Sequence, residues 1–163
     1  MRSVGLNLER WIKRELLHIH AVRPTSTGLE GHLAAMHKLI TDHKPSVVVV
    51  DPITNLISIG DSLAVKAMLT RMIDFLKMQG ITAMFTNLTP EGAMEQTVIG
   101  ISSLMDSWVL LRDVEQGEAR RRVLYLLKSR GMAHSNRMVE FELSERGITL
   151  HTDGLALQQR TSA

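Results

Sequence analysis

The sequence predicts an α/β fold in which a doubly wound parallel sheet continues into antiparallel strands. Segments with helical and strand-like periodicity alternate through residue 111, and two long strand-like segments follow. The run SVVVV at residues 46–50 has no polar alternation, which is typical of a parallel strand buried on both faces. With 163 residues, of which 44% are hydrophobic, the chain is long enough for one core.

The N-terminal third is predicted to hold two helices and one strand. Asn7 can cap a short helix over residues 8–15, and residues 17–22 follow as a strand. After a turn at residues 23–25, hydrophobic residues recur at helical spacing over residues 29–43. Lys44-Pro45 is expected to end this helix.

The middle of the chain is predicted to repeat the strand and helix pattern. The strand at residues 46–50 is followed by a helix that begins at Asp61 or Ser62 and runs to about Met78. Gly80 is expected to end that helix. Residues 81–86 then form the next buried strand, and residues 87–96 form a polar loop.

The C-terminal part is predicted to be richer in strands. A short helical piece at residues 99–104 precedes a strand at residues 107–111, and Gln116-Gly117-Glu118 forms a turn. Residues 121–128 and 138–143 are then expected to pair as antiparallel strands. Residues 152–163 are interpreted as a tail.

The composition excludes several classes of function. Because the chain has no cysteine, disulfides, thiolate metal sites and cysteine nucleophiles are excluded, which fits a cytoplasmic protein. A net charge of +2 and 4% aromatic residues give little support for nucleic-acid binding. No apolar run is long enough to span a membrane. The seven histidines do not show the spacing of a metal site, so none is proposed from them.

Asp51 is the sharpest candidate for a functional residue. It follows the VVVV run, and α/β sheets bind ligands at the carboxyl ends of their strands. In P-loop enzymes this is the Walker B position, where an aspartate helps to hold Mg²⁺. The alternative is an aspartate that starts a turn before Pro52. The Walker A pattern G-x-x-x-x-G-K-[ST] is missing, since no glycine in the sequence precedes a lysine.

Two basic segments follow later in the chain. Lys128 and Arg130 are two residues apart at a predicted strand end, where they could bind phosphate oxygens or form a solvated hairpin tip. The run Arg120-Arg121-Arg122 is interpreted as a solvated hairpin edge, with a partner surface as the alternative.

The hydroxyls of Ser102 and Ser103 are also considered, because phosphorylation would add charge that arginines can pair with. The alternative for these two residues is capping of a helix or turn.

Four segments together resemble the KaiC family of RecA-like ATPases. They are VVVVDPITNLISIG, ITAMFTNLTPEG, ISSLMDSWVLLRDVE and LYLLKSRGMAHSNRMVEFELSERGI, and they occur in the family's order. The resemblance covers residues 1–151, which correspond to the later part of one KaiC domain without the Walker A segment. It implies a partial three-layer α/β/α P-loop NTPase fold. It also implies a ring, usually a hexamer, with ATP and Mg²⁺ between neighbouring subunits.

The resemblance also assigns roles to individual residues. Asp51 falls on the Walker B aspartate that binds Mg²⁺, and Lys128 and Arg130 fall on a catalytic basic pair that reaches the neighbouring subunit's nucleotide phosphates. His134 and Asn136 fall in the loop near the ribose and base. A further pair, Ser102 and Ser103, falls on the adjacent serine and threonine autophosphorylation sites of the clock protein, although the second position here is serine.

Two functions follow from the resemblance. The first is an ATPase or serine autokinase domain fragment, inactive alone because the phosphate loop and the paired catalytic glutamates have no counterpart. Signalling or clock proteins would be its partners. The second is a non-catalytic KaiC-like module that self-associates or binds a full-length partner through an exposed sheet edge.

Overall fold

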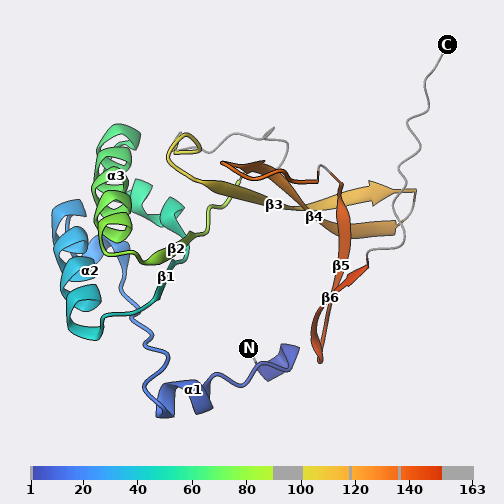
Figure 1. Ribbon diagram of the computed structural model, residues 1–163, viewed down its shortest axis with the longest axis horizontal. Helices are drawn as coiled ribbons and strands as arrows, with labels where there is room; N and C mark the ends of the chain where they lie inside the picture. The colour runs from blue at the N-terminus through green and yellow to red at the C-terminus, as the bar shows by residue number, and fades with distance from the viewer. Residues whose placement is uncertain (1, 90–100, 118, 136, 152–163) are drawn as a thin grey trace. The chain divides into compact units, whose positions relative to one another are not determined.

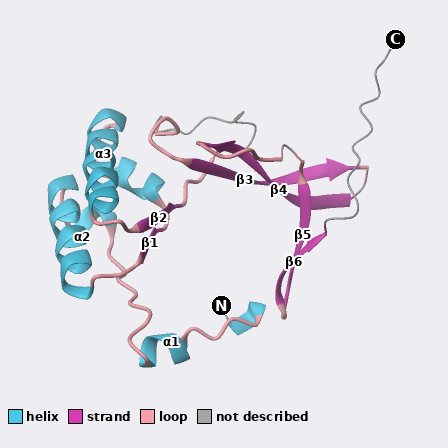
Figure 2. Ribbon diagram, viewed as in Figure 1, coloured by secondary structure: helices cyan, strands magenta, loops and turns pink. Residues whose placement is uncertain are grey.

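The computed structural model describes residues 2–89, 101–117, 119–135 and 137–151, which fall into two compact units (Figure 1). We call residues 21–105 the helical unit, and residues 1–20 together with 106–163 the sheet unit. Helices dominate the first unit and antiparallel strands the second (Figure 2). Among the described residues, no helix is long and apolar enough to cross a membrane.

The helical unit contains the predicted alternation of helices and parallel strands. Helix α2 (Leu29–His43) leads into strand β1 (Val47–Val50), and helix α3 (Ser62–Met78) leads into strand β2 (Thr82–Phe85). The two strands are parallel, in a register that runs from the pair Val47 and Thr82 to the pair Val50 and Phe85. The predicted α/β class, with a parallel sheet followed by antiparallel strands, is confirmed.

Local signals account for the ends of both long helices. Lys44 ends α2 in the left-handed conformation, with φ of 45°, and its N–H donates to the carbonyl of Ile40 at 2.9 Å. Asp61 caps α3 by accepting a hydrogen bond from the N–H of Ala64 at 2.8 Å. Both helix predictions are therefore confirmed, and α2 has the predicted bounds.

The core of the helical unit lies where α2 and α3 pack on one face of the β1–β2 sheet. Val48, Val50 and Phe85 of the two strands pack against this core. Its buried residues come mostly from the two helices and from the 3-10 helix η3 (Ile53–Ser58): Leu33, Ile40, Ile53, Leu56, Val65, Met68, Leu69, Met72, Leu76 and Ile101.

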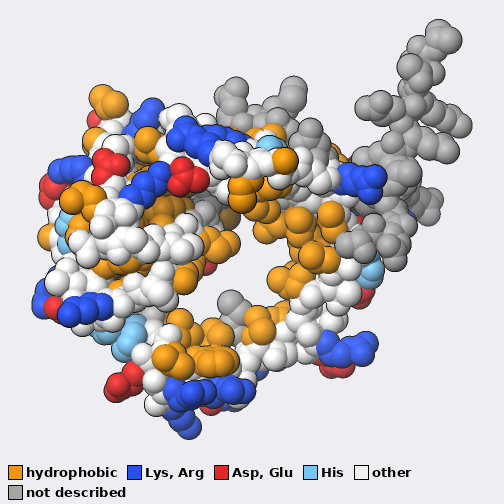
Figure 3. Space-filling view, in the orientation of Figure 1, with side chains coloured by type: hydrophobic (Ala, Val, Ile, Leu, Met, Phe, Trp, Pro, Cys, Tyr) orange, Lys and Arg blue, Asp and Glu red, His pale blue; other side chains and the backbone are white. Residues whose placement is uncertain are grey.

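The opposite face of the β1–β2 sheet is exposed, so the expectation that residues 46–50 are buried on both faces is wrong, and so is the expectation that residues 81–86 form a buried strand. Val47, Val49 and Met84 are 55%, 57% and 58% exposed, respectively. Alternate side chains of a strand point to opposite faces, and the two described long helices cover only one of them. Hydrophobic side chains consequently reach the molecular surface (Figure 3).

The sheet unit is an antiparallel sheet in the order β3-β4-β5-β6. Its strands are β3 (Ser107–Gln116), β4 (Ala119–Ser129), β5 (Val139–Ser144) and β6 (Gly147–His151). The predicted antiparallel pairing of residues 121–128 with 138–143 is confirmed, although only two residue pairs of β4 and β5 are in register. β6 was not predicted, because a five-residue strand after a two-residue turn leaves a weak local signal.

The N-terminal segment also differs in part from expectation. The predicted first helix is present as α1 (Glu9–Lys13), preceded by the 3-10 turn η1 (Arg2–Val4). The predicted strand at residues 17–22 is absent, since this segment has no regular structure and Ile19 is 66% exposed. A strand needs a neighbour for its backbone hydrogen bonds, and none of the described strands pairs with this segment.

Two further expectations concern the connection and the tail. The expected helical piece at residues 99–104 is a turn over residues 102–104, with residues 99 and 100 outside the described residues. Residues 87–89 of the expected loop have no regular structure, and residues 90–96 lie outside the described part, as does the tail at residues 152–163.

Candidate functional site

Asp51 lies at the carboxyl end of β1, as predicted. The last registered pair of the two parallel strands is Val50 and Phe85, so Asp51 and Thr86 come directly after the two strands. The hydroxyl of Thr86 donates a hydrogen bond to Oδ1 of Asp51. Asp51 is exposed, Thr86 is half-buried, and a cis peptide bond joins Asp51 to Pro52.

The carboxylate oxygens of Asp51 fit one side of a magnesium site. Mg²⁺ prefers oxygen ligands and is usually held by one or two carboxylates together with water and phosphate oxygens. Asp51 would provide one such carboxylate, and its exposure leaves it accessible to the ion. No cluster of three histidine, aspartate or glutamate side chains that could hold a metal occurs among the described residues. Asp51 would therefore share the ion with ligands from elsewhere.

Lys128 and Arg130 lie at the end of β4 in the sheet unit. Lys128 is half-buried and pairs in register with Trp108, whereas Arg130 is exposed in the turn that follows the strand. The N–H of Arg130 donates to the carbonyl of Asp106 at 2.8 Å, which fixes the start of this turn. Gly131 has φ of 72°, a conformation that glycine adopts without a steric penalty.

The remaining predicted site residues are spread over both units. Ser102 is half-buried and Ser103 is exposed, and both lie in the turn after Ile101. His134 is exposed, with Nδ1 3.4 Å from the carbonyl oxygen of Met132. Asn136 lies outside the described residues. Asp51 and the serines thus belong to the helical unit, whereas Lys128, Arg130 and His134 belong to the sheet unit.

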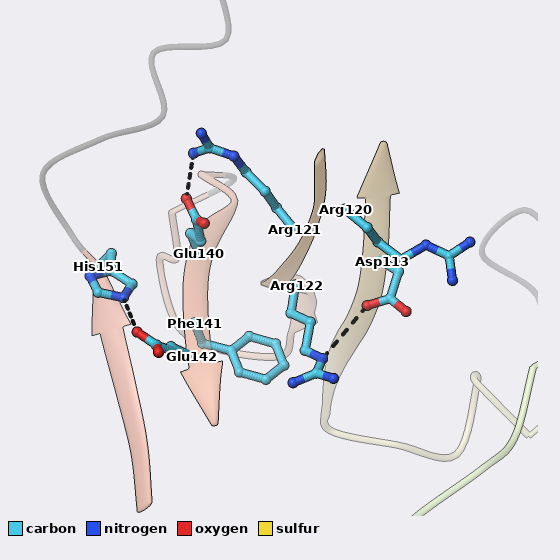
Figure 4. A pocket seen from close by; sticks show the side chains of 8 residues that line it. All are labelled: Asp113, Arg120, Arg121, Arg122, Glu140, Phe141, Glu142 and His151. Atoms are coloured by element: carbon cyan, nitrogen blue, oxygen red, sulfur yellow. Dashed lines mark hydrogen bonds and ion pairs between the residues drawn. The ribbon is translucent and has the colours of Figure 1, made fainter. Parts of the chain in front are cut away.

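The run of three arginines lines a charged hollow on the sheet unit (Figure 4). Arg121 binds Glu140 at 2.9 Å, and Arg122 lies 3.9 Å from Asp113. The third arginine, Arg120, lies 3.5 Å from a carboxylate oxygen of Glu115.

Because each of these arginines faces a carboxylate, the hollow carries little excess positive charge. Phosphate backbones are bound by such an excess, so the hollow gives no support to nucleic-acid binding. The ion pairs agree with the interpretation as a solvated hairpin edge and do not test the alternative of a partner surface.

Thr86 is the site residue that sequence reasoning missed. Its signal was a hydroxyl at the last position of the second predicted parallel strand, residues 81–86. Carboxyl ends of parallel strands meet at one edge of a sheet, so Thr86 could have been placed beside Asp51 from the pattern.

Two parallel strands with helices packed on one face, an acidic residue at a strand's carboxyl end and a following antiparallel sheet define an α/β protein. The family model described as "ATPase: KaiC" matches residues 1–154. The chain therefore belongs to the KaiC family of ATPases, and the predicted resemblance is confirmed.

Three relatives illustrate the match. The chain is 45% identical over 153 residues to the "Circadian clock protein KaiC2" of Synechocystis sp., covering 92% of this chain and 27% of that protein. It is 33% identical over 150 residues to the "Circadian clock oscillator protein KaiC" of Thermostichus vulcanus, covering 91% and 29%. For the protein of the same name from Synechococcus elongatus, the identity is 31% over 147 residues, covering 89% and 28%. The chain thus spans less than a third of the length of these relatives.

Proposed function

We propose that the chain supplies two parts of an ATP site formed between neighbouring subunits of a KaiC-type ring. Asp51 is the carboxylate for Mg²⁺, and Lys128 with Arg130 faces the phosphates bound by the adjacent subunit. The observation that carries this proposal is the position of Asp51 at the carboxyl end of β1, where the Thr86 hydroxyl meets it. Membership of the KaiC ATPase family supports it.

The chemistry of each side chain fits its proposed role. When bound, Mg²⁺ neutralises charge on phosphate oxygens. The guanidinium of Arg130 offers a planar fork of N–H donors to phosphate oxygens, and the ammonium of Lys128 offers a compact charge. Cations supplied by a neighbouring subunit stabilise the negative charge of the transition state in phosphoryl transfer. His134 and Asn136 are proposed to lie near the ribose and base.

The proposed site needs a phosphate loop from residues outside this sequence. No glycine of the printed sequence precedes a lysine, so the G-K step of that loop is missing. Backbone N–H groups and a lysine of the loop would otherwise cradle the phosphates. We therefore expect the chain alone to bind Mg-ATP weakly and to hydrolyse it negligibly.

Calorimetric titration of the chain with Mg-ATP tests this expectation. The heat should show no saturable binding tighter than about 100 μM, whereas a fusion to the phosphate-loop segment of a KaiC relative should bind saturably. A dissociation constant near 1 μM for the unchanged chain would contradict the proposal, because binding that tight would require a phosphate-binding loop that the sequence does not contain.

Ser102 and Ser103 are the proposed phosphorylation sites for a serine autokinase activity. Ser103 is exposed, so its hydroxyl is accessible without unfolding, whereas Ser102 is half-buried. Mass spectrometry of the ATP-incubated fusion should find phosphate first on Ser103.

A second candidate function is a non-catalytic module for self-association or binding of a full-length partner, supported by the exposed face of the β1–β2 sheet. Val49 and Met84 are more than half exposed on this face, and each of the two strands has one described neighbour only. A face and edge of this kind favour pairing with another chain.

Light scattering during size-exclusion chromatography tests the second candidate. If it holds, the chain forms a dimer or larger species that Val49→Lys dissociates. The control Leu63→Lys places the same charge at a 77%-exposed leucine of α3 and should leave the species intact. A strict monomer at high concentration would count against this function.

A further inference from the structure

Thr86 is placed beside Asp51 by two backbone hydrogen bonds, one from its N–H group and one to its carbonyl group. Its N–H donates to the carbonyl of Val50 at 3.0 Å, and its own carbonyl accepts from the N–H of Ile53 at 2.9 Å. These bonds connect β2 to the residues immediately before and after Asp51-Pro52. The hydroxyl of Thr86 therefore meets the Asp51 carboxylate from a backbone that is held in place.

The side-chain alternation of the two strands, continued by one residue beyond Val50 and Phe85, places Asp51 and Thr86 on one face of the sheet. Val49 and Met84 precede Asp51 and Thr86 by two residues and are both exposed, and side chains two residues apart on a strand point to the same face. The hydrogen bond between the Thr86 hydroxyl and Asp51 thus belongs to the exposed face of the β1–β2 sheet. It occupies a lone pair on Oδ1, while an ionised carboxylate has about four acceptor sites over its two oxygens.

We propose that Thr86 is a positioning residue that fixes the Asp51 carboxylate for a divalent cation, an inference that rests on the proposed function of Asp51. Carboxylates that ligate metals are themselves hydrogen-bonded, and their partners fix the orientation of the ligand. A rotating aspartate would have to be ordered when the cation binds, whereas a carboxylate held by Thr86 is already oriented.

A purely structural role explains the hydrogen bond between Thr86 and Asp51 less well than a positioning role does. β1 and β2 are already joined by backbone hydrogen bonds at both ends, from Thr82 N–H to Ser46 at 3.1 Å and from Thr86 N–H to Val50 at 3.0 Å. The side-chain bond is exposed, so it adds little to the pairing of the strands. Its specific consequence is the orientation of Asp51.

The test uses Mn²⁺ alone as the probe and the full chain as the protein. Bound Mn²⁺ broadens the NMR signals of nearby amides, so a titration yields both the location of the ion and its dissociation constant. We expect broadening centred on the amides of Val50, Ile53 and Asn87. Asp51→Asn should abolish it, and Thr86→Val, which keeps the side-chain shape but removes the hydroxyl, should weaken binding by about tenfold or more.

Two further variants separate positioning from a change in the fold. Thr86→Ser keeps the hydroxyl and should restore the affinity for Mn²⁺. Thr82→Val makes the same chemical change on the same strand at its other end, where Thr82 is paired with Val47, and should leave the affinity unchanged.

Chemical shifts of α2 and α3 report whether each variant remains folded. If Thr86→Val unfolds the helical unit, the role of Thr86 is tested by comparing the Mn²⁺ affinity of Thr86→Ser with that of the unchanged chain. Weaker Mn²⁺ binding by a folded Thr86→Ser variant overturns the inference.

The outcomes distinguish this inference from the proposed function. Binding that Asp51→Asn abolishes but Thr86→Val leaves unchanged would overturn the role of Thr86 and retain that of Asp51. No localised broadening in the unchanged chain would overturn the inference, whereas the proposed function is tested by the fusion that includes the phosphate-loop segment. Equal losses in Thr86→Val and Thr82→Val would also overturn the positioning role, because they would reflect a general effect on β2.

Discussion

Arg130→Ala should lower the rate of ATP hydrolysis by about 10³-fold in a fusion of this sequence to the phosphate-loop segment of a KaiC relative. The arginine is proposed to stabilise negative charge that develops on the neighbouring subunit's phosphates, and a cation of this kind acts mainly in the transition state. The Michaelis constant for ATP should therefore change much less than the turnover number. Steady-state kinetics of the assembled fusion measure both quantities.

A matched control is available on the same sheet. Arg120→Ala removes an exposed arginine of β4 that faces Glu115, a carboxylate, and should alter the turnover number less than twofold. Lys128→Ala should resemble Arg130→Ala in the direction of its effect. Similar turnover numbers for the Arg130→Ala and Arg120→Ala fusions would show that Arg130 does not stabilise charge on the nucleotide phosphates.

Leu69→Ala should lower the free energy of unfolding of the helical unit by about 2–5 kcal/mol. Leu69 lies on α3 and is 1% exposed in the core of the helical unit. Its truncation therefore removes apolar contacts and leaves a cavity. Urea denaturation, followed by circular dichroism, measures the change.

Leu63→Ala on the same helix is the control for Leu69→Ala. Leu63 is 77% exposed, and its truncation should change the free energy of unfolding by less than about 0.5 kcal/mol. If both variants lost the same stability, the assignment of the α3 face that packs on the core would be wrong.

Local sequence patterns were sufficient for the long helices and the central strands. In α3 the cap at Asp61 and buried residues at helical spacing agree with each other, so the helix could be predicted with its start. The covering of a strand could not be predicted in the same way. Val47 and Val49 belong to an unbroken valine run, yet their exposure depends on which layers pack on the sheet, and local sequence does not encode that.

Missing long-range information also explains the errors at the ends of the chain. Residues 17–22 have a strand-like composition, but whether a strand forms depends on a neighbouring edge. The short strand β6 arises in the opposite way, because β5 provides five registered pairs for it.

The candidate site shows the same division between local and long-range information. Asp51 could be identified from its own strand, because an acidic residue that ends a valine run is a local signal. The contribution of Thr86 depends on the register between β1 and β2, which pairs Val50 with Phe85. A one-residue shift in that register would have placed Thr86 on the opposite face from Asp51.

The most direct test of the proposed site is a mixing experiment with two inactive fusions. In Asp51→Asn subunits the cation ligand is lost, and in Arg130→Ala subunits the phosphate-facing cation is lost. If the two residues act on opposite sides of a subunit interface, random mixed rings contain interfaces with both intact residues. An equal mixture should then recover about one quarter of the unmutated fusion's ATP hydrolysis. Activity no greater than that of the two variants measured separately would contradict the shared site.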